Sequence, residues 1–476
     1  MPALMPQFLD RPVFRLISEV AAERRVKAFV IGGYVRDCLL GRECNDIDVV
    51  VEGSGIDFAK AVGKKSGRNV SYFPSFGTAM LRFHGDEIEF VGARKESYRR
   101  ESRKPIVENG TLEDDQRRRD FTINALALSL QQGADCYGEL VDPFGGVRDL
   151  ASGIIRTPLD PDTTYSDDPL RMLRAVRFAA KLSTPELPFK IVPESMESMR
   201  RMAGRLSILS VERITDELGK MMASPNPSMA FRLMDEAGLL VHILPEITAL
   251  KGVETVDGKG HKDNFQHTLA VLDNVSAVSD SVPLRWAALM HDIGKPATKR
   301  FDPVIGWSFH GHEVAGSKMV PVIFDRLRLP IEMSKYVRKL VWLHLRPIAL
   351  VDDGVTDSAV RRLLFDAGDD IDDLMMLCNA DITSKNPAKV ARIKSNFELV
   401  KQKLVDVEAK DQIRNFKNPI TGEYIMEVYG IPPGREIGVL KESVKEAILD
   451  GLIGNNFEEA DAFMRRKAEE MGMNAK

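Results

Sequence analysis

The sequence is poor in the residues that mark several common protein classes. It has only four cysteines (Cys38, Cys44, Cys136 and Cys378), and none of them forms a CxxC pair. This scatter argues against a cysteine zinc site and suits a reducing compartment. No apolar run approaches the length of a membrane span, and the N-terminus lacks a basic segment followed by an apolar one. We therefore expect a cytoplasmic protein without a membrane partner, and nothing in the sequence indicates an obligate protein partner.

Excess positive charge is also missing. The formal net charge is −4 over 476 residues, so any surface that binds nucleic acid must be local. Basic clusters occur at 94–95, 99–100, 103–104, 117–119, 200–205 and 213. Taken singly, each cluster is more simply interpreted as a solvated face, but together they are candidates for RNA phosphate contacts.

The pattern of apolar residues predicts a head of mixed α/β structure. An amphipathic helix is expected within residues 1–25, and strands of a mixed sheet are expected at 27–31, 46–51, 79–83 and 88–91. Residues 92–118 are charged and poor in large apolar side chains, which predicts a mobile loop.

From Asp168 onward, apolar residues recur at helical spacing, which predicts an all-α body. The chain is too long for one ordinary core. We predict four parts: an α/β head at 1–155, a helical neck at 156–250, a helical domain rich in histidine at 251–385 and a helical tail at 386–476. A Gly/Pro turn at 430–434 is expected to separate two helices of the tail.

Two carboxylates stand on one predicted strand of the head. Side chains alternate along a strand, so Asp46 and Asp48 point the same way. Two neighbouring carboxylates repel, and a divalent ion is their natural compensation, with Mg²⁺ favoured by oxygen ligands and phosphates. Two such ions can bind an attacking hydroxyl and triphosphate oxygens together. Glu89, on a later strand, could supply a third carboxylate.

A glycine pair precedes these carboxylates. Gly32 and Gly33 would let backbone N–H groups approach phosphate closely. Arg36 would supply a fixed positive charge for the β and γ phosphates. Alone, the glycines indicate a turn and the aspartates a solvated strand end. Their spacing favours a nucleotide site.

The segments GGYVRDCLLG (32–41) and NDIDVVVEG (45–53) resemble the head of the tRNA CCA-adding enzymes of the bacterial and eukaryotic class, and of the bacterial poly(A) polymerases. The resemblance covers essentially the whole chain. It implies a polymerase-β-like nucleotidyltransferase head in which Asp46 and Asp48 bind Mg²⁺, with Glu89 as a further catalytic residue.

A second segment, RRRDFTINA (117–125), is similar to the family segment RRDFTxNA beside the ribose and triphosphate. The resemblance implies that Arg119, Asp120 and Asn124 bind the nucleotide. Without the resemblance, an N-capped helix explains this segment equally well.

A third segment, DDPLRMLRAVRF (167–178), suits base recognition. With Pro169 at a first helical position, Asp168 and Arg171 lie on one helix face. Asp168 can accept the amino group of cytosine or adenine, while Arg171 donates to the adjacent ring nitrogen. Guanine and uracil would mismatch both contacts, and each good contact is worth roughly 1–3 kcal/mol. An Asp–Arg ion pair within the helix is the competing interpretation.

The family motif at this position is EDxxR, so Asp167 here replaces a glutamate. Arg174 and Arg177 follow in the same segment and complete the predicted nucleotide-binding set.

Six of the eight histidines fall between 261 and 344. Together with nearby aspartates they suit a transition metal. Their series resembles the HD phosphohydrolase superfamily. The resemblance implies metal held by His267, His291, Asp292 and Asp381, with His312 and His344 completing a second position. Lys295 could bind phosphate.

These observations predict an enzyme that adds C, C and A to the tRNA 3′ end from CTP and ATP without a nucleic-acid template. One alternative is a poly(A) polymerase, or an enzyme that adds only A or only CC. Another is an HD phosphohydrolase whose head is a vestigial RNA-binding module. The HD metal is expected to be a divalent transition metal.

Overall fold

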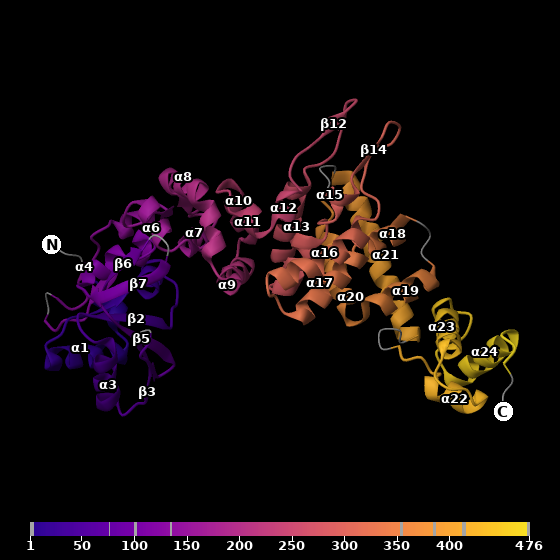
Figure 1. Cartoon of the computed structure of the whole chain (residues 1–476), viewed down its shortest axis with the longest axis horizontal. Coiled ribbons are helices and arrows are strands. Elements are labelled where there is room, and N and C mark those ends of the chain that lie inside the picture. Colours follow the sequence, from indigo (N-terminus) through magenta and orange to yellow (C-terminus); the bar gives the residue numbers. More distant parts are fainter. Residues whose placement is uncertain are drawn as a thin grey trace. The chain divides into compact units, whose positions relative to one another are not determined.

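The computed structural model describes residues 4–75, 77–99, 102–133, 136–352, 356–383, 387–411 and 416–473 (Figure 1). The chain divides into two compact units, Met1–Ile243 and Leu244–Lys476, which are described separately below. Within the described residues, no helix combines the length and apolar character needed to cross a bilayer.

The first unit is built on a seven-stranded mixed sheet with the strand order β3-β4-β5-β2-β1-β8-β9. The strands are β1 (Ala28–Ile31), β2 (Asp46–Val51), β3 (Val70–Phe73), β4 (Thr78–Phe83), β5 (Asp86–Gly92), β8 (Ala127–Ser129) and β9 (Leu140–Val141). Only β2 and β5 pair in parallel, while the remaining pairs are antiparallel. The four predicted strands are confirmed as β1, β2, β4 and β5.

Helices cover the sheet of the head. The expected N-terminal helix is α1 (Pro12–Arg24), which starts on a proline, and it is followed by α2 (Gly33–Leu39) and α3 (Gly55–Ser66). The central strand β1 is buried on both faces, as its continuous apolar run predicts.

The mobile loop predicted at 92–118 is wrong. Strands β6 (Arg94–Arg99) and β7 (Ser102–Asn109) pair as an antiparallel hairpin, and α4 (Leu112–Arg117) follows with a Thr111 capping box. A two-stranded ribbon outside the main sheet need not bury one face, so it lacks the apolar alternation that marks a strand. Within the basic clusters expected here, Arg100 and the side chains of Lys95, Arg99, Arg103 and Lys104 lie outside the described part of the chain.

The neck is helical as predicted, except for one short strand. After α5 (Gly146–Ala151), which still belongs to the predicted head, the helices of the neck in the first unit are α6 (Pro161–Asp167), α7 (Leu170–Leu182), α8 (Pro193–Met202), α9 (Val211–Met222), α10 (Pro227–Glu236) and α11 (Leu240–Ile243). The exception is β11 (Lys190–Ile191), which pairs in parallel with β10 (Ile154–Ile155). Two residues are too few to give a periodic signal.

The second unit is a helical body. Its helices are α12 (Pro245–Thr248), α13 (Asn264–Ser276), α14 (Val282–Met290), α15 (Lys295–Thr298), α16 (His312–Arg326), α17 (Ile331–Leu343), α18 (Arg346–Asp352), α19 (Asp357–Ala367), α20 (Ile371–Ala380), α21 (Pro387–Asp411), α22 (Gly422–Tyr429), α23 (Arg435–Leu449) and α24 (Phe457–Glu470). Gly430 ends α22 in the left-handed conformation, so the predicted break between two tail helices is confirmed.

Two hairpins interrupt this body and project from it (Figure 1), which corrects the expectation of helix alone at 251–385. They are β12 (Thr255–Val256) with β13 (Lys259–Gly260), and β14 (Arg300–Asp302) with β15 (Gly306–Ser308). Asp257 and Gly258 both have positive φ at the first turn, as a two-residue hairpin loop requires.

The close approach of α15 to α16 depends on a residue without a side chain. A Cβ on Gly294 would lie 2.2 Å from the carbonyl oxygen of His312 and 2.6 Å from the amide nitrogen of Gly316. Both are backbone atoms, so a side chain at Gly294 would force the two helices apart.

We therefore expect Gly294→Ala to lower the free energy of unfolding by about 1–3 kcal/mol, the usual cost of overpacking. Chemical denaturation measures this loss. Gly438→Ala, in α23, is the matched control: among the described residues nothing lies within 4 Å of the position that its new methyl group would take. It should be neutral or stabilising by up to ~1 kcal/mol. Equal midpoints for Gly294→Ala and the wild type would contradict the close packing.

Candidate active sites

The three predicted carboxylates of the head meet on neighbouring strands. In the parallel pairing of β2 with β5, Asp48 stands directly opposite Glu89, and Asp46 opposite Glu87. Side chains alternate along each strand, so Asp46, Asp48 and Glu89 share one face of the sheet.

The electrostatics at Asp48 favour a bound cation. Burial, and the negative charges of Asp46 and Glu89, raise the pKa of Asp48 to about 6, although Arg119 opposes the shift. A crowded set of carboxylate oxygens that is short of positive charge suits Mg²⁺.

Gly32 lets the backbone pass beside these groups. Its φ is +83°, and a Cβ would lie 2.7 Å from Nη1 of Arg119 and 3.4 Å from Oδ2 of Asp48. Gly33 follows as the first residue of α2. Gly32 therefore brings main chain, carboxylate and guanidinium together, which a larger residue at this position would prevent.

A chain of buried hydrogen bonds links the head to the neck. Nη1 of Arg36 donates to Oδ1 of Asn124 (2.6 Å), and Nδ2 of Asn124 donates to Oδ1 of Asp120 (3.0 Å). Oδ2 of Asp120 accepts from Nε of Arg174 (2.7 Å), while Nε of Arg36 donates to Asp37 (2.8 Å). Burial opposes ionisation of Asp120, but Arg174 and Asn124 outweigh it and hold its pKa below the usual value.

Three guanidinium groups of this hydrogen-bonded region lie around the ring of Phe178 on α7. The guanidinium carbons of Arg36, Arg174 and Arg177 lie 5.1, 5.4 and 4.3 Å from its ring centroid. Arg177 also donates to Glu217 at 2.6 Å in a buried ion pair. The sequence predicts that Arg36 and Arg177 contact the nucleotide. In the structure, both guanidinium groups bind other side chains of the protein. Phe178 and Glu217 carried no sequence signal of this role.

An open cavity of about 280 Å³ brings together five of the predicted nucleotide-binding residues. Its lining consists of Arg118, Arg119, Asp120, Asp168, Leu170, Arg171, Arg174 and Arg213. The five arginines outnumber the two aspartates, so the cavity suits an anion such as a triphosphate. The predicted residues Gly32, Gly33, Arg36, Asn124, Asp167 and Arg177 do not belong to this lining.

The two predicted base-reading residues lie in this cavity, but not on one helix. Asp168 precedes α7 with an extended backbone, and α7 begins at Leu170, one residue after the predicted Pro169. Oδ1 of Asp168 accepts from the amide of Leu170 (3.2 Å), and Oδ2 accepts from Nη2 of Arg213 (3.1 Å). The sequence indicated Arg213 only as a phosphate contact.

Arg171 is also held by the protein. Its Nη2 donates to the carbonyl oxygen of Arg118 (2.6 Å), and its Nη1 donates to that of Thr164 (3.3 Å). Asp167 is the last residue of α6. The side chains of Asp168 and Arg171 therefore border the same cavity from fixed positions.

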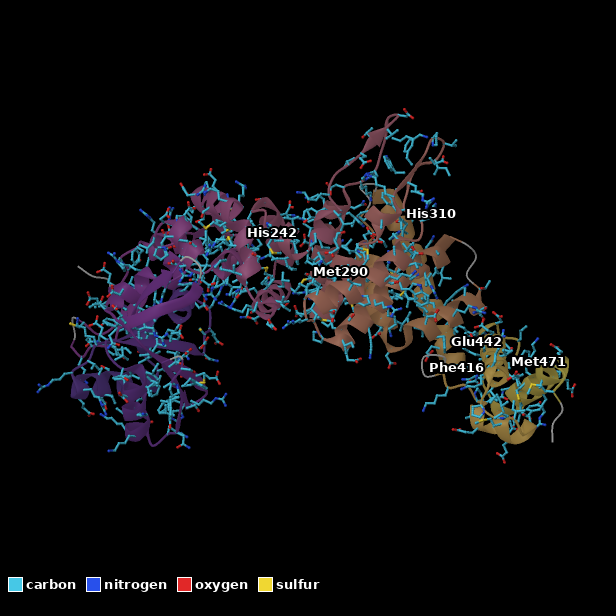
Figure 2. The ribbon with its side chains drawn as sticks, in the orientation of Figure 1. His242, Met290, His310, Phe416, Glu442 and Met471 are labelled. Atoms are coloured by element: carbon cyan, nitrogen blue, oxygen red, sulfur yellow. The ribbon has the colours of Figure 1, made fainter. Side chains whose placement is uncertain are left out.

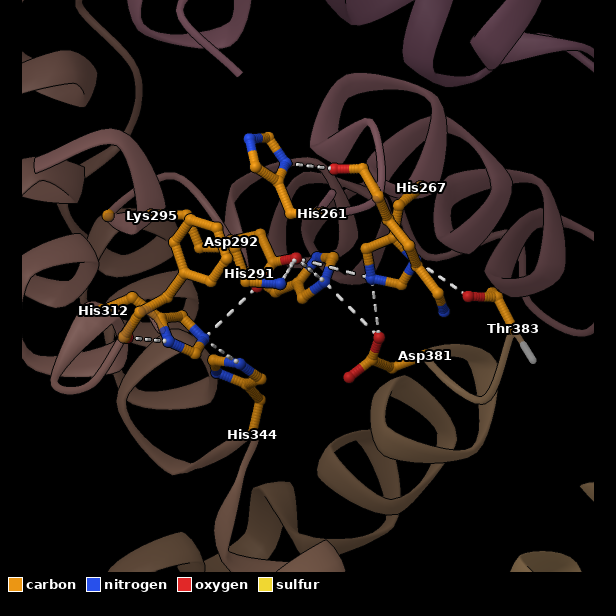
Figure 3. Close-up of polar contacts among 12 residues, drawn as sticks. His261, His267, His291, Asp292, Lys295, His312, His344, Asp381 and Thr383 are labelled. Atoms are coloured by element: carbon orange, nitrogen blue, oxygen red, sulfur yellow. Dashed lines mark hydrogen bonds and ion pairs between the residues drawn. The ribbon is translucent and has the colours of Figure 1, made fainter. Parts of the chain in front are cut away.

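The histidine series of the second unit converges on one centre (Figure 3). The residues come from α13, the end of α14, the first residue of α16, the end of α17 and the end of α20. Potential ligand atoms form two groups, each with all its atoms within 4.8 Å of one another. The groups are His267, His291 and Asp381, and Asp292, His312 and His344.

The imidazoles are oriented with Nε2 toward this centre. Nδ1 of His291, His312 and His344 bonds the carbonyl oxygen three residues earlier in the chain, at 2.8, 2.8 and 2.6 Å. Nδ1 of His267 bonds Oγ1 of Thr383 at 2.8 Å. Such contacts fix the tautomer and ring orientation of metal-binding histidines.

The Nε2 atoms that face the centre are better placed to bind a metal ion than to hydrogen-bond with one another. Nε2 atoms of His312 and His344 are 3.2 Å apart. Within the described part of the chain, Nε2 of His291 is buried and makes no hydrogen bond, although Oδ2 of Asp292 lies 3.2 Å away. Buried polar atoms usually have partners, so this donor set indicates a cation site.

The charge states around the centre also suit a cation. Burial opposes ionisation of Asp292 and Asp381, but His291 holds the pKa of Asp292 well below its usual value. The hydrogen bond from His267 and the charge of His291 lower that of Asp381 to about 2. Burial and the neighbouring His291 lower the pKa of His344 to about 4, so this imidazole is neutral at pH 7. Nζ of Lys295 lies 2.5 Å from Oδ2 of Asp292 at the edge of the centre.

Three family models match consecutive parts of the chain. "Poly A polymerase head domain" matches residues 28–156, "Probable RNA and SrmB-binding site of polymerase A" matches 188–251, and "HD domain" matches 264–383.

Curated relatives extend the comparison. A multifunctional CCA protein of Methylococcus capsulatus is 35% identical over 373 residues, covering 75% of this chain and 81% of the relative. An A-adding tRNA nucleotidyltransferase of Deinococcus radiodurans is 33% identical over 367 residues, covering 75% and 80%. A solved tRNA nucleotidyltransferase, complexed with a primer tRNA and an incoming ATP analogue, matches with a TM-score of 0.57 and 25% identity, covering 81% of this chain and 98% of that one.

We expect the histidine centre to bind Mn²⁺. His267→Ala and Asp381→Asn should each weaken binding by at least roughly tenfold, because each removes a predicted ligand. Calorimetric titration of the full chain measures the affinity. His310→Ala is the control, since His310 is exposed and outside the cluster (Figure 2). An equal loss in the control variant would contradict the assignment.

Proposed function

This chain belongs to the family of tRNA nucleotidyltransferases that includes the multifunctional CCA proteins, and on that premise we propose that it adds C, C and A to the tRNA 3′ end. The substrates would be CTP and ATP, selected by protein side chains without a nucleic-acid template. The observation that carries the proposal is the single cavity that holds Asp168 and Arg171 beside Arg119, Asp120 and Arg174.

The head residues would perform the transfer as follows. Asp46, Asp48 and Glu89 would hold Mg²⁺, which, when bound, lowers the pKa of the attacking 3′-hydroxyl and neutralises phosphate charge. In the reaction the RNA 3′ oxygen bonds to the α-phosphorus and loses its proton. The bond from the α-phosphorus to the bridging oxygen breaks, and pyrophosphate leaves. The arginines of the cavity bind the triphosphate and orient it.

Base selection would rest on the two fixed side chains at the rim of the cavity. The Asp168 carboxylate accepts an amino N–H, and the Arg171 guanidinium donates to the adjacent ring nitrogen, so cytosine and adenine match both groups. The protein groups now paired with them, a guanidinium on Asp168 and a carbonyl on Arg171, have the same donor and acceptor polarity as these bases. A narrower product remains the main alternative, because one relative is an A-adding enzyme.

We also propose a phosphohydrolase activity for the second unit, within residues 251–385. The six residues of the histidine centre would hold a divalent transition metal, which supplies an activated water when bound. Hydrolysis would join a water oxygen to the phosphorus of an ester, break the ester P–O bond and pass a proton of the water to the released oxygen. Lys295 would bind a phosphate oxygen. We further propose that the chain divides after residues 155, 250 and 385. The transfer residues would then lie in the first two parts and the phosphohydrolase residues in the third.

The decisive experiment incubates the full chain with tRNA that lacks CCA and with labelled CTP or ATP. We expect both labels to be incorporated. Asp46→Ala with Asp48→Ala should abolish incorporation and leave phosphate release from a model ester intact, while His291→Ala with Asp292→Ala should do the reverse. ATP labelling without CTP labelling would replace CCA addition with A addition. Transfer by the head variant would refute the metal assignment.

Arg213 should act as a positioning residue for base selection, because it fixes the Asp168 carboxylate. We expect Arg213→Ala to reduce the preference for CTP over UTP, measured as the ratio of kcat/KM values, by roughly tenfold. Arg213→Lys should recover part of it. Arg201→Ala, which breaks the exposed ion pair with Asp162, is the control. A lower KM for CTP with unchanged preference would show instead that Arg213 only blocks the site.

A further inference from the structure

Two lysines of α15 and its C-terminal end lie over two aromatic rings beside the histidine centre. Nζ of Lys295 is 5.7 Å from the ring centroid of Phe309, and Nζ of Lys299 is 4.4 Å from that of Trp307. The lysines are four positions apart on a helical turn, and the rings are two positions apart on extended chain. Each ammonium group therefore lies over one ring, with the two chain segments running in opposite directions: Lys295 with Phe309 forms the first rung of a ladder, and Lys299 with Trp307 forms the second.

The first rung belongs to the histidine centre. Lys295 pairs with Asp292, and the carbonyl oxygen of Phe309 bonds Nδ1 of His312 at 2.8 Å. The second rung lies one helical turn farther along, toward the two hairpins. Four residues of helix span about 6 Å.

The second rung is held by the hairpins. Nε1 of Trp307 donates to the carbonyl oxygen of Lys259 (3.1 Å), and Nζ of Lys259 donates to those of Pro303 (2.8 Å) and Val304 (2.6 Å). Lys259 thus ties one hairpin to the other. The ring under Lys299 is fixed by both hairpins.

Lys299 is paired with an anion that a ligand can replace. Its Nζ lies 2.8 Å from Oε1 of Glu254, whose side chain is 65% exposed. The Lys299 side chain is 20% exposed and stays in place, whereas the exposed Glu254 carboxylate can return to water when a phosphate replaces it.

We propose that Lys299, supported by Trp307, forms a second phosphate subsite of the histidine centre. The ligand class is an oligonucleotide end with two phosphates separated by a nucleoside, one at Lys295 and the next at Lys299. We place the two phosphates one nucleoside apart because the two lysines are separated by about one helical turn, roughly 6 Å along the helix axis. This inference rests on the proposed phosphohydrolase function, and it assigns that function a polynucleotide substrate rather than a free mononucleotide.

The test compares the dinucleotide ApAp, which carries a 3′-phosphate, with 3′-AMP and ADP in calorimetric titrations of the full chain with Mn²⁺. Heat that remains in the His291→Ala/Asp292→Ala variant reports binding elsewhere and is subtracted. We expect ApAp to bind roughly tenfold more tightly than 3′-AMP, because a second charged contact is made.

Variants at the second rung should change ApAp binding selectively. Lys299→Ala should remove the advantage of ApAp and leave 3′-AMP unchanged, Lys299→Arg should keep it, and Glu254→Gln should increase it. Arg300→Ala removes a neighbouring exposed charge and should have no effect.

Three results would overturn the subsite: equal affinities of the wild type for ApAp and 3′-AMP, equal weakening of both ligands by Lys299→Ala, or tighter binding of ADP than of ApAp. Failure of the phosphohydrolase proposal has a different signature. In that case no phosphate is released from ApAp, while the Lys299-dependent preference in binding persists and supports the subsite.

Discussion

The ionised, buried carboxylate of Asp120 is the group on whose contacts the arginine-lined cavity of the first unit depends. A charge in that position is unfavourable unless Arg174 and Asn124 both contact it. Arg174 lies on α7 of the neck, and Asn124 lies beside the sheet of the head. Because both bind the Asp120 carboxylate, these contacts fix the position of α7 relative to the sheet. Arg36 then binds Asn124, which connects the helix after the glycine pair to the same network. Buried charged contacts therefore help to position the cavity walls, together with the apolar side chains that α7 buries.

The carboxylate cluster of the head and the histidine centre of the second unit differ in the groups that surround their carboxylates. In the head, acids stand beside acids, and the pKa of Asp48 rises as a result. In the second unit, acids alternate with imidazoles, and the pKa values of Asp292 and Asp381 fall. The first arrangement has only oxygen donors and suits a hard ion, whereas the second adds nitrogen donors and suits a softer one. The difference in chemistry follows from the difference in ligand type.

The sequence predicted those features whose signals are local. The strand that bears Asp46 and Asp48 was readable because two polar–apolar pairs lead directly into a run of valines within six residues. Asp257-Gly258 was an available hairpin signal that the helical expectation overrode. The contact of Arg213 with Asp168 was not readable, because it joins α9 to the extended residue before α7, 45 positions earlier in the chain. The start of α7 was misplaced by one residue, since a proline can serve at the cap as well as in the first turn.

The position of Asp381 in the chain has a consequence for synthesis. Every residue that lines the nucleotide cavity has been made once the ribosome passes Arg213, and all of them belong to the compact unit that ends at Ile243. The histidine centre, by contrast, draws on helices spread from His267 to Asp381 and cannot assemble before the last of them emerges. Domains generally fold as units in the order of their synthesis. The nascent chain thus completes its first compact unit, with the arginine-lined cavity, before the last residues of the histidine centre have been made.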